Sequence, residues 1–504
     1  MEWVTAGWAV ALAAVYLVLP PLGSDLSAQV ARAGFFADHG WAPVDLRWYG
    51  GVNQLGYSLV SQPVMATLGV RVTGALALVA AAAIFAVLLR RVSAPRPWLG
   101  SLIGAACIAG NLVSGRVTYG LGVCFGLGAL LLLTYRKAAW LAAPVALLAG
   151  ATSPVAGLFV GLAGAALLLA GRVRDGLLVA VPAAVPVGVA ALLFGDGGWM
   201  NISLQDMLRS AGVSVLVALL ATQRAVRIGA ALSAAGVLAA WLIHTPVGLN
   251  ATRLVTMFAL PVLAAYARVP KWAVPPALVA VCALLSPVVV GDVRDIGNPT
   301  SDPAYFRPLR DRLAMVSLTG RVEVPPTRDY WEAAHLGDVP LARGWLRQAD
   351  IDRNPLFFEK VPGASGTGVK LTADSYRAWL AETSVQYVAL PDAEFSWPGR
   401  AEAALVEGGL PYLRQVWSDE HWRLYAVVDA EPVVAPPAVT VEQAGASVTF
   451  DAPAAGDVMV RVRYYRWLRV EPPAVVEPAG VWTRVRVPGP GRYRLTSALR
   501  TSGA

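Results

Sequence analysis

The sequence predicts an α-helical polytopic membrane protein with about eleven transmembrane helices, followed by a C-terminal region outside the bilayer. Only 15% of the 504 residues are charged and 56% are hydrophobic, whereas a soluble domain carries roughly 25% charged residues. The apolar residues form blocks up to about residue 290, with the charges in the gaps between them. A hydrocarbon core of about 30 Å needs about 20 apolar helical residues, so the blocks match membrane spans.

Each apolar block is assigned as one span. The first is expected to be a retained span, because it follows Met-Glu-Trp rather than a basic segment and has no small-residue cleavage site. A turn at Thr152-Ser153-Pro154 divides the longest apolar stretch into a hairpin. The predicted spans are 4–22, 71–89, 98–114, 118–135, 138–152, 154–171, 176–194, 211–223, 228–246, 252–267 and 272–290.

Basic residues are concentrated in alternate loops. The loops after the second, fourth, sixth, eighth and tenth spans hold eleven of them, and the short loops on the other side hold only Arg116, Arg209 and Arg253. The positive-inside rule places the first set in the cytoplasm. The N-terminus is then cytoplasmic, and the chain after about Gly291 lies outside a plasma membrane. The net charge of +8 follows from this topology, so nucleic acid is not expected as a partner.

The first outer loop, residues 24–70, is too long and too aromatic to be a passive connector. Its first part, Asp25–Asp38, has apolar residues at helical spacing, and Ser24 is expected to be the N-cap. We expect this helix to lie on the outer membrane surface. The rest of the loop is rich in ring-bearing and small residues, namely Trp41, Trp48, Tyr49, Gly50, Gly51, Tyr57 and Pro63.

Asp25 directly follows the first span, at the boundary between lipid and water. A carboxylate there can act as a general base on an acceptor hydroxyl. It can also be an acid in the first helical turn, where the helix dipole favours it, and both roles can hold at once. Asp38 and Asp45 are weaker candidates for this carboxylate in the same loop. Asp45, Trp48 and Tyr49 are also weaker candidates for substrate binding.

Polar residues in three other outer turns are further candidates, because charged groups at membrane depth need a cavity or a partner. Arg116 and Arg253 could hold a phosphate group through their guanidinium donors, or they could anchor the helix ends at the interface. His244 and Asn250 lie close to Arg253 in the chain. The three cysteines are far apart and lie inside spans, so no metal ligand set is evident, although a divalent metal remains possible as a cofactor.

The region after the bundle is expected to hold two units. Residues 291–430 mix helical and strand patterns and predict a small extracytoplasmic α/β domain. Short alternating runs over 438–500 predict a small β-sandwich. The stretch Ala342–Phe358, rich in Arg, Asp and aromatic residues, is expected to dock onto the bundle or to contact a substrate. Within the α/β domain, the predicted helices are 303–314, 328–335, 373–382 and 399–408, and the predicted strands are Val385–Leu390, Leu413–Trp417 and Trp422–Val428.

Several short motifs resemble those of large actinobacterial multi-pass proteins that are related to the GT-C glycosyltransferases. They are DLSAQVARAGFF, RWYGG and GYSLVSQPVMATLG in the first outer loop, and RVEVPPTRDYWEAAHL and ARGWLRQADIDRNP further on. The resemblance implies a GT-C-like bundle with an extracytoplasmic C-terminal domain, transferring a sugar from a polyprenyl-phosphate donor to a glycan or glycolipid acceptor of the cell envelope. It places the loop-one acid of the family at Asp25. The sequence lacks the paired acid that many GT-C enzymes carry in this loop, which leaves metal dependence open.

Two other functions are compatible with the sequence. A transporter or lipid flippase usually has internal repeats and charged residues near the midplane, but the two halves show no repeat and the polar residues cluster at the outer edge. A non-catalytic scaffold for envelope assembly would use the β-sandwich to bind a glycan or a protein partner.

Overall fold

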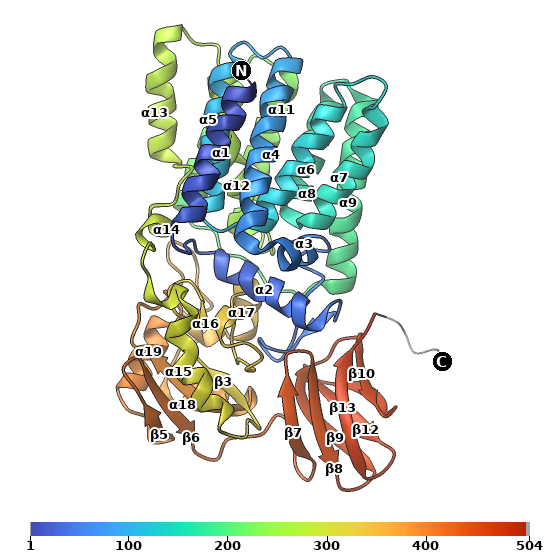
Figure 1. The fold of residues 1–504 in the computed structure, drawn as a ribbon, viewed down its shortest axis with the longest axis vertical. Helices are drawn as coiled ribbons and strands as arrows, with labels where there is room; N and C mark the ends of the chain where they lie inside the picture. The colour runs from blue at the N-terminus through green and yellow to red at the C-terminus, as the bar shows by residue number, and fades with distance from the viewer. Residues whose placement is uncertain (1, 500–504) are drawn as a thin grey trace.

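The computed structural model describes residues 2–499. A bundle of long helices forms one end of the molecule, and the C-terminal helices and sheets form the other end (Figure 1). Two helices of the first outer loop, α2 (Leu26–His39) and α3 (Ser61–Leu68), lie between these two parts.

A helix lies at each of the eleven predicted spans. Four segments are long and apolar enough to cross a membrane, namely Val70–Arg91, Val173–Phe194, Arg224–Leu242 and Gly248–Tyr266, and six shorter apolar helices accompany them. The helices of the bundle are α1 (Glu2–Val18), α4 (Val70–Arg91), α5 (Pro97–Val113), α6 (Val117–Leu132), α7 (Ala142–Thr152), α8 (Pro154–Leu169), α9 (Val173–Phe194), α10 (Leu204–Leu220), α11 (Arg224–Leu242), α12 (Arg253–Tyr266) and α13 (Val274–Leu284).

Two predicted boundaries differ from the structure by more than five residues. Helix α10 begins at Leu204, seven residues before the predicted span, because the Ser203 hydroxyl accepts a hydrogen bond from the backbone N–H of Asp206 and caps the helix. Helix α13 ends at Leu284 rather than at residue 290. Pro287 follows closely, and proline disfavours the helical conformation of the residue before it.

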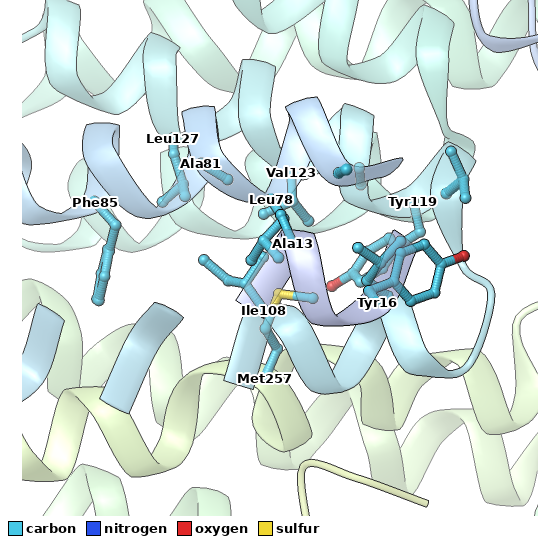
Figure 2. Packing of buried hydrophobic residues seen from close by; sticks show 14 of the residues in the cluster. Ala13, Tyr16, Leu78, Ala81, Phe85, Ile108, Tyr119, Val123, Leu127 and Met257 are labelled. Atoms are coloured by element: carbon cyan, nitrogen blue, oxygen red, sulfur yellow. The ribbon is translucent and has the colours of Figure 1, made fainter. Parts of the chain in front are cut away.

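The core of the bundle is apolar and closely packed. Figure 2 shows side chains of α1, α4, α5, α6 and α12 that meet in one cluster of buried residues. The labelled members are Ala13, Tyr16, Leu78, Ala81, Phe85, Ile108, Tyr119, Val123, Leu127 and Met257. The first helix therefore shares a core with a helix more than 200 residues later in the chain, α12, which fixes where the first outer loop begins.

The sequence predicted that α2 lies on the outer membrane surface. In the structure, α2 is instead covered by other parts of the protein. It packs against α3, α4 and α6 on the bundle side and against α16 (Glu332–His335) of the C-terminal part, so its apolar and polar faces are both covered by protein. Its N-cap residue is Asp25 rather than Ser24, and the Asp25 side chain makes no capping hydrogen bond.

The segment after the bundle contains the predicted α/β elements, except that the predicted helix 328–335 is shortened to α16 (Glu332–His335). Its sheet has the strand order β3-β4-β6-β5, with β3 parallel to β4 and the other pairs antiparallel. Strand β3 was not predicted, because it is only three residues long. The main elements are α15 (Pro303–Ala314), β3 (Arg321–Glu323), α17 (Arg347–Arg353), α18 (Ala373–Glu382), β4 (Val385–Pro391), α19 (Arg400–Glu407), β5 (Leu413–Ser418) and β6 (Trp422–Val427).

The last part of the described chain forms two antiparallel sheets, β10-β13-β8-β7 and β11-β12-β9. Side chains from both sheets share one buried cluster, including Phe450 and Leu495 from the first sheet and Val460 and Val485 from the second. The strands are β7 (Val439–Ala444), β8 (Ser447–Ala452), β9 (Gly456–Arg463), β10 (Leu468–Glu471), β11 (Val475–Ala479), β12 (Trp482–Val487) and β13 (Gly491–Ser497).

Candidate active site

Two glycines bring the first outer loop against the turn between α5 and α6. Gly23 (φ +107°) and Gly115 (φ +74°) have backbone conformations that side-chain-bearing residues rarely adopt. A Cβ on Gly23 would lie 2.4 Å from the carbonyl oxygen of Val113, and one on Gly115 would lie 2.4 Å from the nitrogen of Leu26. This close approach places Asp25 beside Arg116.

The carboxylate of Asp25 is bound by the two arginines that the sequence singled out. Its Oδ2 accepts a hydrogen bond from Nε of Arg116 at 3.1 Å and from Nη2 of Arg253 at 3.0 Å. The other oxygen, Oδ1, has no hydrogen-bond partner among residues 2–499. The three side chains are 14–21% exposed, so the cluster is partly buried and keeps some contact with solvent.

Each guanidinium keeps donors that no protein group of the described chain uses. Arg116 binds through Nε alone and Arg253 through one terminal nitrogen, whereas a guanidinium carries five N–H donors. Two arginines and one aspartate leave a net positive charge at the site. This donor set suits an anionic ligand such as a phosphate group.

Asp292 of α14 (Val290–Arg294) holds both turns in place. Its Oδ1 accepts from the backbone N–H of Ser24 at 3.0 Å, and its Oδ2 accepts from the hydroxyl of Ser114 at 2.5 Å. The backbone N–H of Asp25 donates to the carbonyl of Ser114 at 3.1 Å. The segment after the last bundle helix therefore fixes the positions of Asp25 and Arg116.

A chain of neutral hydrogen bonds adjoins the charged cluster. The amide of Gln29, one turn after Asp25 on α2, donates to the hydroxyl of Tyr57 at 2.6 Å, and its carbonyl oxygen accepts from the hydroxyl of Thr118 at 2.6 Å. Burial raises the pKa of Tyr57, which keeps its hydroxyl protonated. The guanidinium of Arg32 stacks over the Tyr57 ring at 4.1 Å.

The stretch Ala342–Phe358 contributes Trp345 to this region. The indole N–H of Trp345 donates to the carbonyl of Ser24 at 3.1 Å, and its ring meets the edge of Tyr57 at a centroid distance of 6.5 Å. Arg353 of the same stretch pairs with Asp196, in the segment after α9, at 3.1 Å. The stretch therefore docks onto the bundle loops, which was one of the two predicted roles, and it also borders the Asp25 cluster.

An apolar groove runs along α12. It has a volume of about 310 Å³ and is lined by side chains of α4, α6, α8, α10, α11 and α12. It includes Leu254 and Val255, directly after Arg253, and extends to Tyr266. At 1.5 Å per residue, this stretch of α12 is roughly 18 Å long, so the groove follows most of α12. Asp25, Arg116 and Arg253 are not among its lining residues, although Leu254 directly follows Arg253 in the chain.

The structure places three predicted loop residues away from Asp25, in packing positions. Asp45 is buried in β1 (Val44–Asp45), and Arg47 binds both of its oxygens, the closer at 2.8 Å. Trp48 has no exposed surface, and the hydroxyl of Tyr49 donates to the carbonyl of Gly344. These contacts favour a structural role over substrate binding for all three residues.

His244 and Asn250 lie on either side of the turn before α12. His244 is exposed and stacks on Trp199 at a ring-centroid distance of 4.2 Å. Asn250 is buried in a short 3-10 helix, Gly248–Thr252, that leads into Arg253. Neither side chain forms a hydrogen bond or ion pair with Asp25, Arg116 or Arg253 in the described chain. Among residues 2–499, no group of three or more His, Cys, Asp or Glu side chains is arranged to hold a metal ion.

Sequence reasoning did not assign Gln29, Tyr57, Thr118 or Trp345 to the site. A signal for Gln29 was present, because it is four residues after Asp25 and such residues share one face of a helix. Thr118 is close to Arg116 in the chain, but residues two apart do not share a helix face, so its spacing carried no such signal. Tyr57 and Trp345 come from segments almost 300 residues apart, and no local pattern could have paired them.

No protein-family model matches the chain, and no curated protein matches its sequence. Solved structures similar to it include the arabinofuranosyltransferase AftD from Mycobacteria, with a TM-score of 0.47 and 18% identity over 90% of this chain. A mutant AftD structure gives a TM-score of 0.47 and 13% identity, covering 99% of this chain and 60% of AftD. ArnT from Cupriavidus metallidurans, bound to undecaprenyl phosphate, gives 0.46 and 14% identity over 84% of this chain and 99% of ArnT. This chain spans only 41% of the length of the first AftD structure, and likeness at this level assigns no activity to it.

Proposed function

We propose that the protein is an inverting, lipid-linked glycosyltransferase of GT-C type with Asp25 as the general base. The observation that carries the proposal is the cluster itself, in which one accessible carboxylate meets two arginines with free donors. The motifs of the first outer loop, which resemble those of GT-C-related proteins, support the same reaction class. The donor is a polyprenyl-phosphate sugar and the acceptor a hydroxyl of a cell-envelope glycan or glycolipid.

In the proposed reaction, the acceptor hydroxyl attacks the anomeric carbon of the donor sugar. The new glycosidic bond forms as the bond between that carbon and the phosphate oxygen breaks, and its electron pair leaves with polyprenyl phosphate. Asp25 Oδ1, which accepts no hydrogen bond from any described residue, accepts the hydroxyl proton. The anomeric centre is inverted because the hydroxyl attacks the face opposite the leaving group.

Arg116 and Arg253 stabilise the negative charge of the leaving phosphate. The donor phosphodiester carries one negative charge, and the released phosphate monoester gains a second. Donors already in place where this charge develops stabilise the transition state more than the ground state. The donor phosphate competes with Asp25 for the same guanidiniums, so donor binding weakens the ion pairs that hold the carboxylate in the free protein.

The groove along α12 is the proposed site of the polyprenyl tail. Its lining is mostly apolar, and it begins within one helical turn of Arg253. When the phosphate is bound by the two arginines, the first isoprenoid units of the tail therefore lie in the groove. The positive-inside pattern supports placing this end of the bundle, and everything after about residue 291, outside the plasma membrane.

The testing experiment measures transfer of radiolabelled sugar from polyprenyl-phosphate donors by the purified full chain in nanodiscs. We expect Asp25→Asn to lower the transfer rate about a hundredfold or more, since general-base catalysis contributes roughly 10²–10⁴. Asp38→Asn is the matched control, because Asp38 is an exposed acid on the same helix, and its rate should equal that of the wild type.

Two results would count against the proposal. One is full transfer by Asp25→Asn. The other is no transfer with any donor by folded protein that still binds the lipid, which would favour a flippase or an assembly scaffold.

A further inference from the structure

A small cavity lies where the first outer loop, the α/β segment and the C-terminal sheets meet. Its volume of about 10 Å³ is roughly the space needed for one water-sized occupant. Tyr49 and Gly50 line it from the loop, and a Cβ on Gly50 would lie 3.1 Å from Nη2 of Arg321 and 3.0 Å from the Trp482 ring. The cavity is thus closed by three parts of the chain that are far apart in sequence.

Arg321 enters this cavity as a buried cation without a counter-charge. Only 2% of the residue is exposed, and its terminal nitrogens donate to the carbonyls of Thr383, at 2.6 Å, and Arg461. Its Nε has no hydrogen-bond partner in the described chain. No carboxylate among residues 2–499 forms an ion pair with it. Burial, together with the nearby charges of Arg463 and Arg461, lowers the pKa of Arg321 to about 9.

Arg463 is a second cation on the same cavity. Its Nε donates to the carbonyl of Tyr49 at 3.2 Å, and it too has no ion pair within the part of the chain that the structure describes. Burial and the charge of Arg353 lower its pKa to about 10. The guanidiniums of Arg321 and Arg463 lie 5.8 and 5.4 Å from the centre of the Trp482 ring, so one aromatic ring borders both.

The carboxylates around the cavity form no ion pair with Arg321 or Arg463 in the described chain. Asp352 is exposed and acts on Arg463 through its charge alone, which opposes the lowering of the Arg463 pKa. Arg353 lines the cavity as well but is neutralised by Asp196 at 3.1 Å. Glu382 accepts from the indole N–H of Trp482 at 2.6 Å, and it is exposed and paired with neither arginine. Both arginines stay protonated at neutral pH. Arg321 is buried and Arg463 is half-buried, and like charges with little access to water are unfavourable unless an opposite charge accompanies them.

We propose that this cavity binds one small monovalent inorganic anion of the halide class, held between the guanidiniums of Arg321 and Arg463. The volume excludes a phosphate or a sugar, and the two unpaired cations favour an anion over a water molecule. The bound anion ties β3 and β9 to the Tyr49–Gly50 segment and so stabilises the docking of the C-terminal sheets. The site is separate from Asp25 and does not depend on the proposed transferase activity.

The test is thermal unfolding of the purified full chain in sodium chloride, sodium bromide and sodium gluconate at equal ionic strength. A ligand that binds only the folded state raises the unfolding midpoint in a saturable way. We expect an increase on the order of 5 °C with chloride and bromide relative to gluconate, and its loss in Arg321→Met. Arg461→Met is the matched control, because Arg461 lies nearby but already faces Glu431 at 3.7 Å, and it should keep the chloride response.

Equal midpoints in chloride and gluconate would overturn the proposal, as would an unchanged chloride response in Arg321→Met. If that variant does not fold, anomalous scattering from wild-type crystals grown in bromide decides the question. A bromide peak between the two guanidiniums supports the site. Density in the cavity without anomalous signal refutes it.

Discussion

Arg343 is the cation of a buried charge cluster in the α/β segment, and Arg343→Met tests how much this segment depends on it. Its guanidinium binds Asp350 at 2.9 Å and Glu402 at 2.8 Å, and Glu323 lies 3.7 Å away. All four side chains are at most 1% exposed. Methionine has a similar length and fits an apolar site, so the substitution removes the charge and leaves the carboxylates buried.

The expected loss is about 3–5 kcal/mol, the range for removing one partner of a buried ion pair. Protonation limits this loss. Burial raises the pKa of Glu402 to about 7 and that of Glu323 well above its usual value, so both can take up a proton when the cation is absent. The destabilisation should therefore be smaller at pH 5 than at pH 8. For a segment of this size, 1 kcal/mol corresponds to roughly 2–4 °C, so the shift at pH 8 is about 10 °C.

The assay is thermal unfolding of the full chain in detergent, followed by tryptophan fluorescence. Arg377→Met is the control, because Arg377 is exposed on α18, and surface substitutions usually change stability by less than about 0.5 kcal/mol. A shift for Arg343→Met no larger than that of the control would refute the view that Arg343 neutralises this cluster.

Three further predictions concern pH, the groove and the first loop. Burial raises the pKa of Glu332 and Glu402 to about 7 and that of Asp329 to about 9. The folded state therefore holds these protons more tightly than the unfolded state. The stability that these three groups contribute is fully present below about pH 4 and is lost as pH rises through 7 to 9. Unfolding midpoints measured from pH 5 to 9 should fall, and a rise would contradict these pKa directions. Gly229 lines the apolar groove, and a Cβ added there would make only an ordinary contact at 3.5 Å. Gly229→Leu should therefore raise KM for a long-chain donor several-fold more than for a short-chain donor. An equal change for both donors would argue against a tail in the groove. Asp45→Asn leaves the buried Arg47 without its ion pair and should lower the free energy of unfolding by a few kcal/mol. The transfer rate of the protein that stays folded should be unchanged. A loss of rate without a loss of stability would place Asp45 in the candidate active site again.

Much of the candidate site could be predicted from local sequence. Asp25, Arg116 and Arg253 were selected because each stands at a helix end on the outer side of the predicted bundle, and the structure joins all three through Oδ2 of Asp25. Asp45 and Tyr49 were selected by composition alone, and the structure buries both in packing contacts. Position at the membrane boundary was thus more informative than richness in aromatic residues.

The sequence by itself determined the helices of the bundle and most elements of the C-terminal part, because hydrophobic block length and residue periodicity are local properties of the chain. The sequence could not show that α2 is enclosed between the bundle and α16. The apolar spacing of α2 indicates that one of its faces is covered, but it does not indicate whether lipid or protein covers that face. Only the tertiary structure decided that Asp292 fixes the Asp25 turn and that Trp345 borders Tyr57. It also decided that Arg321 and Arg463 share one cavity. These contacts join segments 140 to almost 300 residues apart, and their geometry arises from the packing of whole elements rather than from any local pattern.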